Sequence, residues 1–364
     1  MNTTGKVAVA MSGGVDSSVA AALLQEQGFE VIGVTMKLWN YDDMGGNRNL
    51  ESSCCSVEAI NDARLVCQRL DIPHYVMDLS SRFNTEVIQN FIEEYLLGRT
   101  PNPCVLCNTR IKWEALLQRI QELGADYLAT GHYARVQFNE NSGRYELLRS
   151  SQLQKDQSYA LWGLNQESLS HTIFPLGDFS KDKVREIAGD LNLKNARKSE
   201  SQEICFIPDN DYHRFLKENG GRFEEGPILT TDGEQVGRHS GYPFFTIGQR
   251  RGIGVGLGKP MYVVELIPEK NAIVIGEKQE LKSAGLLAAE VNWIKYPGTV
   301  KPMPLKIKIR YNDSLHPAEL QQLAEDEVEI RFKEPLQAVT PGQSVVFYEG
   351  ESLVGGGIIR KALK

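Results

Sequence analysis

Residues 7–18 read VAVAMSGGVDSS, and this stretch decides the fold of the first part of the chain. The apolar run Val7–Met11 is typical of a buried parallel strand. The two glycines that follow allow a tight turn and let backbone N–H groups come close to a phosphate. The helix expected over residues 17–27 would add its unpaired N–H groups and the positive end of its dipole. The order of strand, glycine turn and helix therefore predicts a phosphate-binding loop at Ser12–Ser17.

The side chains of this loop narrow its chemistry. Ser12, Ser17 and Ser18 can donate hydroxyl hydrogen bonds, and Asp16 could hold Mg²⁺ against a pyrophosphate. The G-x-x-x-x-G-K-[ST] and G-x-G-x-x-G patterns are absent from this turn, so the loop is neither a Walker loop nor a dinucleotide fingerprint. The alternative is a serine-capped turn without a ligand. Two glycines, an acid and two serines together favour ATP.

The pattern continues as alternating strands and helices. Strands are expected at residues 31–35, 74–79 and 127–130, and helices at residues 58–70, 83–97 and 110–123. This alternation predicts an α/β fold with a doubly wound parallel sheet. Ligands of such sheets bind at the carboxyl ends of the strands, where Ser12–Ser17 and the turn at residues 131–133 both fall.

The character of the sequence changes after about residue 220. Glycine becomes frequent and helical periodicity fades, and short alternating runs then follow at residues 305–310, 328–332 and 344–348. These runs predict a small antiparallel β-barrel at the C-terminus. We expect three domains: a catalytic domain (1–215), a small glycine-rich β domain (216–284) and the barrel (285–364).

Composition limits the class of protein. The chain has 364 residues and a net charge of −7, and 41% of its residues are hydrophobic. No apolar run reaches the roughly 18 residues that span a membrane, and no signal peptide is evident, so we expect a cytoplasmic protein without stable disulfides. The negative charge argues against unspecific coating of nucleic acid. Residues 235–264 and 291–312 are nevertheless basic and free of acids, as suits an RNA backbone or a solvated strand face.

Six cysteines offer several kinds of chemistry. Cys67 falls on the apolar face of a predicted helix and is assigned to the core, and a passive role in a polar loop is expected for the adjacent pair at residues 54–55. Cys104 and Cys107 follow two prolines, and Cys107 falls near the N-terminus of the next helix, where the dipole would stabilise its thiolate. Cys205 ends a polar run. A structural zinc site would need four ligands, and no second C-x-x-C or C-x-x-H supplies them.

Motifs spread over essentially the whole chain resemble one enzyme family. They are AMSGGVDS at residues 10–17, GVTMKLW at 33–39, N-P-x-x-x-C-N at 102–108, TGHYAR at 130–135, KDQSYAL at 155–161, SQEICFI at 201–207 and GQRRGIGVG at 248–256. The chain is identified by these motifs as a member of the tRNA-specific 2-thiouridylases. These bacterial enzymes belong to the PP-loop ATP pyrophosphatases, which cleave ATP to AMP and pyrophosphate.

The resemblance assigns roles to individual residues. It implies that ATP binds to Ala10, Met11, Ser12, Gly13, Gly14, Val15, Asp16, Ser17, Met36 and Gly131. The target base would meet Asn102, Pro103 and Cys104. The tRNA would contact His132, Lys155, Asp156, Gln157, Arg310, Tyr311 and Gln343. The expected substrates are tRNAs for lysine, glutamate and glutamine, with a cysteine desulfurase or a sulfur-relay protein as the sulfur donor.

The implied reaction is ATP-dependent 2-thiolation of the wobble uridine, U34. The C2 oxygen is a poor leaving group, so ATP would convert it to an adenylate while Mg²⁺ balances the pyrophosphate. Cys205 would carry a persulfide. Cys107 would be the nucleophile that attacks this persulfide, which either releases sulfide or closes a transient Cys107–Cys205 disulfide.

One departure from the family pattern leaves the sulfur chemistry open. Many relatives carry an aspartate with an acid/base role where this chain has Cys104. Cys104, Cys107 and Cys205 could instead hold a [4Fe–4S] cluster with one open iron. Two further hypotheses are a PP-loop ligase that acts on a small molecule and a tRNA-binding protein without catalysis. The intact loop residues speak against the latter.

Overall fold

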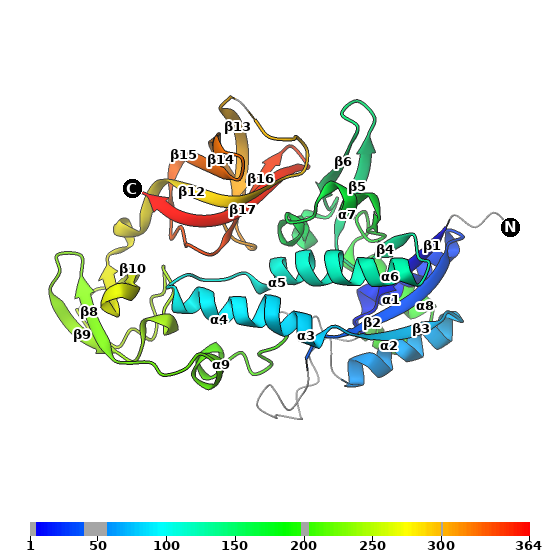
Figure 1. Cartoon of the computed structure of the whole chain (residues 1–364), viewed down its shortest axis with the longest axis horizontal. Coiled ribbons are helices and arrows are strands. Elements are labelled where there is room, and N and C mark those ends of the chain that lie inside the picture. The colour runs from blue at the N-terminus through cyan, green and yellow to red at the C-terminus, as the bar shows by residue number, and fades with distance from the viewer. Residues whose placement is uncertain (1–4, 40–56, 198–203, 300) are drawn as a thin grey trace. The chain divides into compact units, whose positions relative to one another are not determined.

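The structure is a computed structural model that describes residues 5–39, 57–197, 204–299 and 301–364 (Figure 1). By its internal contacts the chain divides into two compact units. The first comprises Met1–Val87, Cys104–Asp211 and Gly350–Leu353. The second comprises Ile88–Pro103, Tyr212–Glu349 and Val354–Lys364. Cys54 and Cys55 lie outside the described residues.

A five-stranded parallel sheet forms the centre of the first unit, in the order β3-β2-β1-β4-β7. Its first strand has the sequence KVAVA, and Val7, Ala8 and Val9 are fully buried because helices cover both faces. The strand order reverses between β1 and β4, which makes this the switch point where doubly wound sheets bind ligands. The strands are β1 (Lys6–Ala10), β2 (Glu30–Lys37), β3 (His74–Asp78), β4 (Tyr127–Ala129) and β7 (Thr172–Ile173).

Helices pack on this sheet through small and aliphatic residues. Val19, Ala20 and Leu24 lie in one buried cluster with Ala63 and Val66. A hairpin, β5 (Ala134–Asn139) with β6 (Arg144–Arg149), also belongs to this unit (Figure 1). The helices are α1 (Val15–Glu26), α2 (Val57–Leu70), α3 (Ser80–Phe83), α6 (Leu117–Glu122), α7 (Gln166–Ser170) and α8 (Lys181–Asp190), with short 3₁₀ turns at Leu153–Lys155, Ser158–Leu161 and Lys194–Arg197.

Two long helical stretches contain wide π-helical turns. One runs from α3 through a π segment at Asn84–Ile88 into α4 (Gln89–Leu96). The other begins with α5 (Pro103–Leu106) and continues through a π segment at Cys107–Leu116 into α6. The expectation that this second helix begins at Arg110 was therefore wrong. A proline fits the first turn of a helix, where an N–H group is not needed.

The second unit contains a four-stranded sheet and a closed barrel. The sheet has the order β10-β11-β8-β9, and the barrel closes because β12 pairs with both β15 and β17. Alternate barrel residues such as Ile307, Leu320, Ile330 and Phe347 fill its core. The elements are α9 (Tyr212–Asn219), β8 (Gly226–Thr230), β9 (Gln235–His239), β10 (Tyr262–Ile267), β11 (Ala272–Gly276), β12 (Lys282–Trp293), β13 (Met303–Lys308), β14 (His316–Ala324), β15 (Glu327–Gln337), β16 (Ser344–Glu349) and β17 (Ser352–Leu363), with 3₁₀ turns at Tyr242–Phe244, Pro268–Lys270 and Lys278–Leu281.

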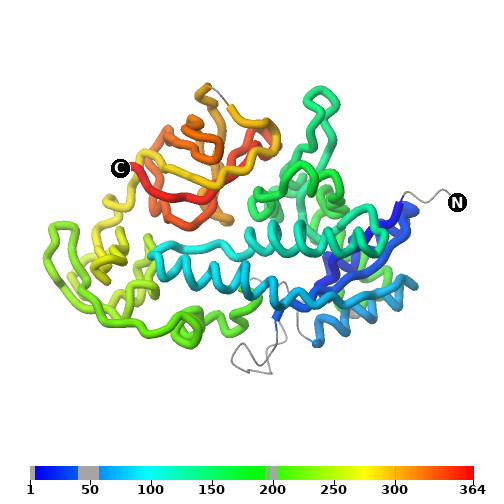
Figure 2. Tube along the Cα trace, in the orientation of Figure 1, coloured from blue at the N-terminus to red at the C-terminus, as the bar shows by residue number. Residues whose placement is uncertain are grey.

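The fold class predicted from the sequence is confirmed: a doubly wound parallel sheet is followed by a small β region and an antiparallel barrel. The Cα trace in Figure 2 follows this order along the chain. The division into three domains at residues 215 and 284 stays a prediction. Among the described residues, no helix has both the length and the apolar character needed to cross a membrane.

Candidate functional site

The phosphate loop (Ser12–Ser17) is held by its own serines. The Ser12 N–H donates to Ser17 Oγ at 3.2 Å, and Ser17 Oγ donates to the Gly14 carbonyl at 3.2 Å. Gly14 is extended and precedes α1 without a side-chain cap, so the first N–H groups of the helix point at the loop. Gly13 has φ +69°, and a Cβ there would lie 2.5 Å from the Ala59 carbonyl oxygen. Only glycine fits this cradle.

The residues predicted to bind ATP lie along one edge of the parallel sheet. The loop follows β1, Met36 lies near the end of β2, and Gly131 follows β4. Gly131 approaches the loop so closely that a Cβ would lie 2.7 Å from the Ser17 nitrogen. These segments meet at the switch point of the sheet, as a nucleotide site requires. The residues fit a polyphosphate, and the assignment of ATP to each of them stays a prediction.

Asp16 is tied to a lysine that the sequence did not single out. Lys181 Nζ lies 2.8 Å from both carboxylate oxygens of Asp16, and the Tyr133 hydroxyl donates to Asp16 Oδ1 at 2.7 Å. Lys181 is buried although it begins α8, where the helix dipole disfavours a cation. The Asp16 carboxylate offsets that cost. Asp16 remains the candidate for Mg²⁺, whose binding there would require Lys181 to give up at least one of these contacts.

A buried asparagine braces the same loop from the other side. Asn195 Nδ2 donates to the Gly13 carbonyl at 3.2 Å and to Ser18 Oγ at 2.9 Å. Its amide oxygen is buried and makes no hydrogen bond with any residue that the structure describes. The hydrogen bond from Asn195 fixes the direction of the Gly13 carbonyl, and with it the orientation of the adjoining peptide groups of the phosphate loop.

His132 lies in an aromatic environment just after β4. Its Nδ1 and Thr130 Oγ1 are 2.6 Å apart, and its ring packs against Trp113 and Phe174. Burial, and secondarily the charge of Lys112, lower the pKa of His132 well below its ordinary value. The imidazole is therefore neutral at physiological pH. It can take part in RNA binding through hydrogen bonds or stacking but not through charge.

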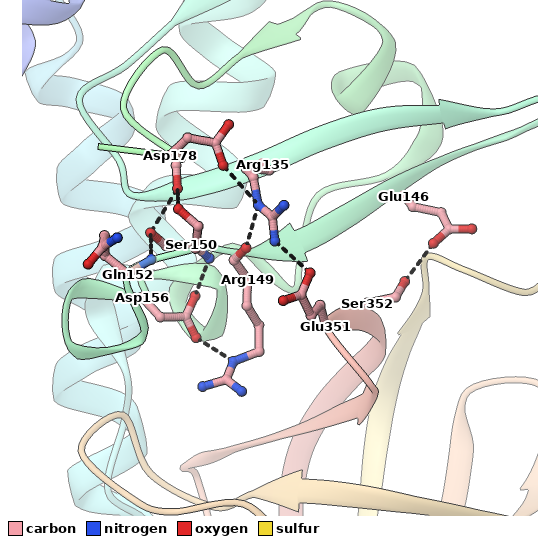
Figure 3. A network of polar contacts seen from close by, with 11 residues as sticks. Arg135, Glu146, Arg149, Ser150, Gln152, Asp156, Asp178, Glu351 and Ser352 are labelled. Atoms are coloured by element: carbon pink, nitrogen blue, oxygen red, sulfur yellow. Dashed lines mark hydrogen bonds and ion pairs between the residues drawn. The ribbon is translucent and has the colours of Figure 1, made fainter. Parts of the chain in front are cut away.

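Asp156 organises the K-D-Q segment at residues 155–157 from within. Its side chain is 1% exposed and accepts hydrogen bonds from the Ser150 N–H and from Arg149 Nε (Figure 3). It also accepts from the backbone N–H of Ser158. The carboxylate thus shapes the loop that carries Lys155, a half-buried residue. A direct contact of Asp156 with RNA stays a prediction.

The same segment connects the phosphate loop with the helix of Cys107. Gln157 Oε1 accepts from the Tyr133 N–H at 2.9 Å, and the Gln157 N–H donates to the Tyr133 carbonyl at 2.9 Å. Tyr133 in turn holds Asp16. Three residues further on, the Ala160 carbonyl accepts from Asn108 Nδ2 at 2.8 Å. Segment 156–160 is therefore linked to the phosphate loop through Tyr133 and is bonded directly to the helix of Cys107.

The predicted nucleophile lies where the helix widens. Cys104 is an exposed residue of the first turn, and Cys107 begins the π-helical segment with a partly exposed side chain. π-helical turns are rare and are often found at functional sites. Asn108, the next residue, also accepts from Lys112 Nζ at 2.8 Å. The side chain of Asn108, next to Cys107, is thus held by two hydrogen bonds, one to the Ala160 carbonyl and one from Lys112.

Cys205 lies in a turn closed by the Ile207 N–H and the Ile204 carbonyl, and it is partly exposed. Phe206 packs edge-on against Phe83 of α3, at 5.7 Å between ring centroids. Arg82 of the same helix pairs with Glu114 in the helical stretch of Cys107. The segments of the two predicted catalytic cysteines therefore both contact α3. None of the described cysteines forms a disulfide, so the Cys107–Cys205 bridge stays a prediction.

A [4Fe–4S] cluster would need Cys104, Cys107 and Cys205 close together as its ligands. Within the described ranges, no group of three or more His, Cys, Asp or Glu side chains is placed to hold a metal ion. Cys104, Cys107 and Cys205 are therefore not gathered in the way a cluster requires.

The remaining predicted RNA residues lie in the second unit. Gln343 Nε2 donates to the carbonyls of Thr100 and Pro101 at 3.0 and 3.1 Å, which fixes the segment that leads to Asn102 and Pro103. Arg310 donates to the carbonyls of Gln337 and Ala338, and Tyr311 is 42% exposed. Gln343 thus positions the segment predicted to meet the target base.

The sequence interpretation missed Lys181, Asn195, Tyr133 and Asn108. A lysine at the first residue of a helix was a signal for Lys181, because a cation there needs a compensating acid. Tyr133 and Asn108 were part of quoted motifs but received no role. Asn195 offered no signal, since an asparagine in a short polar turn is common.

Three family models match this chain, and together they cover most of its length. The family described as tRNA methyl transferase HUP domain matches residues 5–209. The tRNA methyl transferase PRC-barrel domain matches residues 213–277, and the Aminomethyltransferase beta-barrel domain matches residues 283–359.

Individual relatives are similar from end to end. A tRNA-specific 2-thiouridylase of Salinibacter ruber is 51% identical over 99% of this chain and 96% of its own length. That of Carboxydothermus hydrogenoformans is 50% identical over 98% of both chains. A solved complex of a 4-thiouridine synthetase with RNA and ATP is 18% identical over 59% of this chain and 50% of that chain, with a TM-score of 0.37, from which nothing further is concluded. The motifs and the full-length identity together place this chain in the family of tRNA-specific 2-thiouridylases.

Proposed function

We propose that the protein catalyses ATP-dependent 2-thiolation of U34 in tRNA. Segment 156–160 carries this proposal, because it is bonded to Tyr133, which holds Asp16 of the phosphate loop, and to Asn108, the neighbour of Cys107. Activation by ATP and attack by sulfur must act on the same carbon of the base. A single segment that is linked to the phosphate loop through Tyr133 and bonded to the helix of Cys107 suits such a reaction, and the names of the relatives agree with it.

The first half of the reaction is activation. The N–H groups of the phosphate loop and Lys181 would bind the phosphates of ATP, and Gly131 with Met36 would line the nucleotide. Mg²⁺, when bound near Asp16, would neutralise charge on the pyrophosphate. The uridine C2 oxygen would displace pyrophosphate from the α-phosphate, which leaves the base as an adenylate and makes AMP the leaving group.

The second half is sulfur transfer, for which we propose a persulfide on Cys205. Its terminal sulfur would attack C2 of the base, and AMP would depart with the C2 oxygen. The Cys107 thiolate would then attack Cys205 Sγ and close a Cys107–Cys205 disulfide, while the electron pair of the broken S–S bond stays on the sulfur attached to C2. A dithiol reductant would reopen the disulfide, and a sulfur donor would reload Cys205.

The test is a reaction with unmodified tRNA, ATP, Mg²⁺, a dithiol and a cysteine desulfurase with its substrate, followed by nucleoside analysis. We expect 2-thiouridine and AMP from the wild type. Cys107→Ser and Cys205→Ser should still release pyrophosphate in the activation step but form no 2-thiouridine. Cys67→Ala is the matched control, because Cys67 is a buried core residue whose pKa burial raises to about 12, so it should retain activity.

Other outcomes separate the alternatives. Full activity of Cys205→Ser would favour a ligase that acts on a small molecule. No AMP with tRNA present would favour a binding protein without catalysis. If iron and sulfide copurify with the protein under anaerobic conditions and are required for thiolation, a cluster and not a persulfide supplies the sulfur. If no 2-thiouridine forms with a competent sulfur donor, the proposed function is overturned.

A further inference from the structure

A loop of the second unit, Gly248–Gly258, has a backbone that is tied only at its base. The Gly248 N–H donates to the Val263 carbonyl at 2.8 Å, and the Val263 N–H donates to the Gln249 carbonyl at 2.9 Å. From Arg250 to Gly258, no backbone N–H donates to an acceptor in the part of the chain that the structure describes. We name this segment the arginine–glycine loop. A row of solvated N–H donors is the usual way in which a loop binds an anion.

Two apolar side chains hold the loop in place. Ile253 is buried, and Val255 packs so near Gly237 of β9 that a Cβ on that glycine would lie 2.9 Å from it. The rest of the loop from Arg250 onward is exposed. The N–H donors are therefore presented on an anchored backbone, which lowers the entropy cost of binding.

The charge of the loop is not compensated. Arg250 and Arg251 are both exposed, and neither forms an ion pair with any acid in the described ranges. Two other cations of this region differ, since Arg238 pairs with Glu225 and Lys259 pairs with Glu277. No Asp or Glu occurs at residues 235–264. An anionic partner would supply the missing charge.

The base of the loop adjoins residues already predicted to meet tRNA. Thr246 Oγ1 lies 3.5 Å from Thr100 Oγ1, in the segment that leads to Asn102 and Pro103. A Cβ on Gly248 would lie 2.8 Å from Ala338 Cβ, and the Ala338 carbonyl accepts from Arg310. All of these residues belong to the second unit. A polynucleotide bound at residues 100–103 would have its phosphates within reach of the loop.

We propose that the arginine–glycine loop binds the phosphate backbone of the RNA strand that flanks the target nucleotide. The N–H groups of residues 250–258 bind phosphate oxygens, and Arg250 and Arg251 supply the charge. This inference rests on the proposed function, because it takes tRNA as the ligand. Such contacts set position and affinity without reading base sequence.

The first test measures tRNA affinity against salt concentration, by anisotropy with unmodified labelled tRNA. For Arg250→Ala/Arg251→Ala we expect Kd to rise about tenfold near 0.1 M salt, and the slope of log Kd against log salt to fall by about 2. Formation of 2-thiouridine at saturating tRNA should be unchanged. The control Arg238→Ala/Lys259→Ala removes the same charge from the same region, but each of its cations is already paired. We expect a change below about threefold for the control.

A second test alters the backbone without altering charge. Gly254 has φ +80°, whereas Gly256 does not fall in the left-handed region, and a Cβ at either position would meet open space. Gly254→Ala should therefore distort the loop and weaken tRNA binding about threefold or more, and Gly256→Ala should leave it unchanged. Thermal melting of all variants checks that they are folded.

The outcomes distinguish the two proposals. Equal losses in both double variants, or an unchanged Kd for Arg250→Ala/Arg251→Ala, would overturn the loop proposal while normal thiolation leaves the function intact. Equal tRNA affinity of Gly254→Ala and Gly256→Ala would contradict a role of the backbone N–H groups in binding. If Arg250→Ala/Arg251→Ala loses tRNA affinity and the control does not, the loop proposal is supported. If the wild type also forms no 2-thiouridine, the proposed function is contradicted independently of the loop.

Discussion

The phosphate loop and the arginine–glycine loop both depend on glycine, but they differ in the hydrogen bonds that they make with distant segments of the chain. Asp16, Gly13 and Ser18 of the first region are bonded to Lys181, Asn195 and Tyr133, which come from distant segments. In the second loop, the backbone N–H groups of residues 250–258 donate to no acceptor among the described residues. The first is suited to a small ligand whose atoms must be placed accurately for chemistry. The second is suited to a long polyanion that needs affinity but little precision.

If this contrast is right, the largest effect should come from Lys181→Met. Without its ammonium group the phosphate loop presents an uncompensated Asp16 carboxylate to the pyrophosphate, so we expect AMP formation to fall about 100-fold. Quantification of AMP in the presence of tRNA measures this. Lys183→Met is the control, because Lys183 is an exposed residue of the same helix that pairs with Glu186. Equal AMP formation by both variants would mean that Lys181 only stabilises the fold.

Asn195→Ala tests whether bracing from a distant segment matters for the nucleotide. The change leaves the Gly13 carbonyl and Ser18 Oγ without their donor, at a cost of about 1–2 kcal/mol in unfolding free energy. We expect KM for ATP to rise about tenfold, since the direction of the loop N–H groups is loosened. KM for tRNA serves as the internal control and should not change. Parallel changes in both constants would contradict a local role.

Tyr133→Phe should have a smaller effect, because Lys181 still holds Asp16. Loss of one hydrogen bond of 2.7 Å predicts a decrease of about 1 kcal/mol in stability and of up to about fivefold in AMP formation. Tyr145→Phe is a suitable control in the same unit, since its hydroxyl makes no hydrogen bond among the described residues. Chemical denaturation and steady-state kinetics measure the two quantities. Equal stability and equal AMP formation of Tyr133→Phe and Tyr145→Phe would contradict a role of the Tyr133 hydroxyl in linking Asp16 to segment 156–160.

The smallest effect is sought in hydrogen exchange. Peptides that cover residues 250–258 should exchange rapidly in the free protein and become a few-fold slower with bound tRNA, because their N–H groups gain acceptors only then. Peptides that cover residues 19–26 of α1 should exchange slowly in both states. Unchanged exchange at residues 250–258 under saturating tRNA would contradict the difference between the loops.

Much of the first unit could be predicted because its signals are local. The apolar run of β1, the glycines at the turn and the periodicity of α1 each depend on neighbours a few residues away. The start of the helix at Pro103 was misplaced, since a proline can end a loop or begin a helix and the sequence alone does not decide between them. The hairpin β5–β6 was not predicted.

The sequence by itself determined which cysteines are available and to which family the chain is similar, and it predicted where a phosphate binds. Only the tertiary structure decided what holds these groups. Lys181 meets Asp16 across 165 residues, and Asn195 meets Gly13 across 182. It also showed that the Asp156 carboxylate is buried and accepts hydrogen bonds within its own loop. The physical reason is that partners for buried charges and carbonyls are chosen by proximity in space, which local periodicity does not encode.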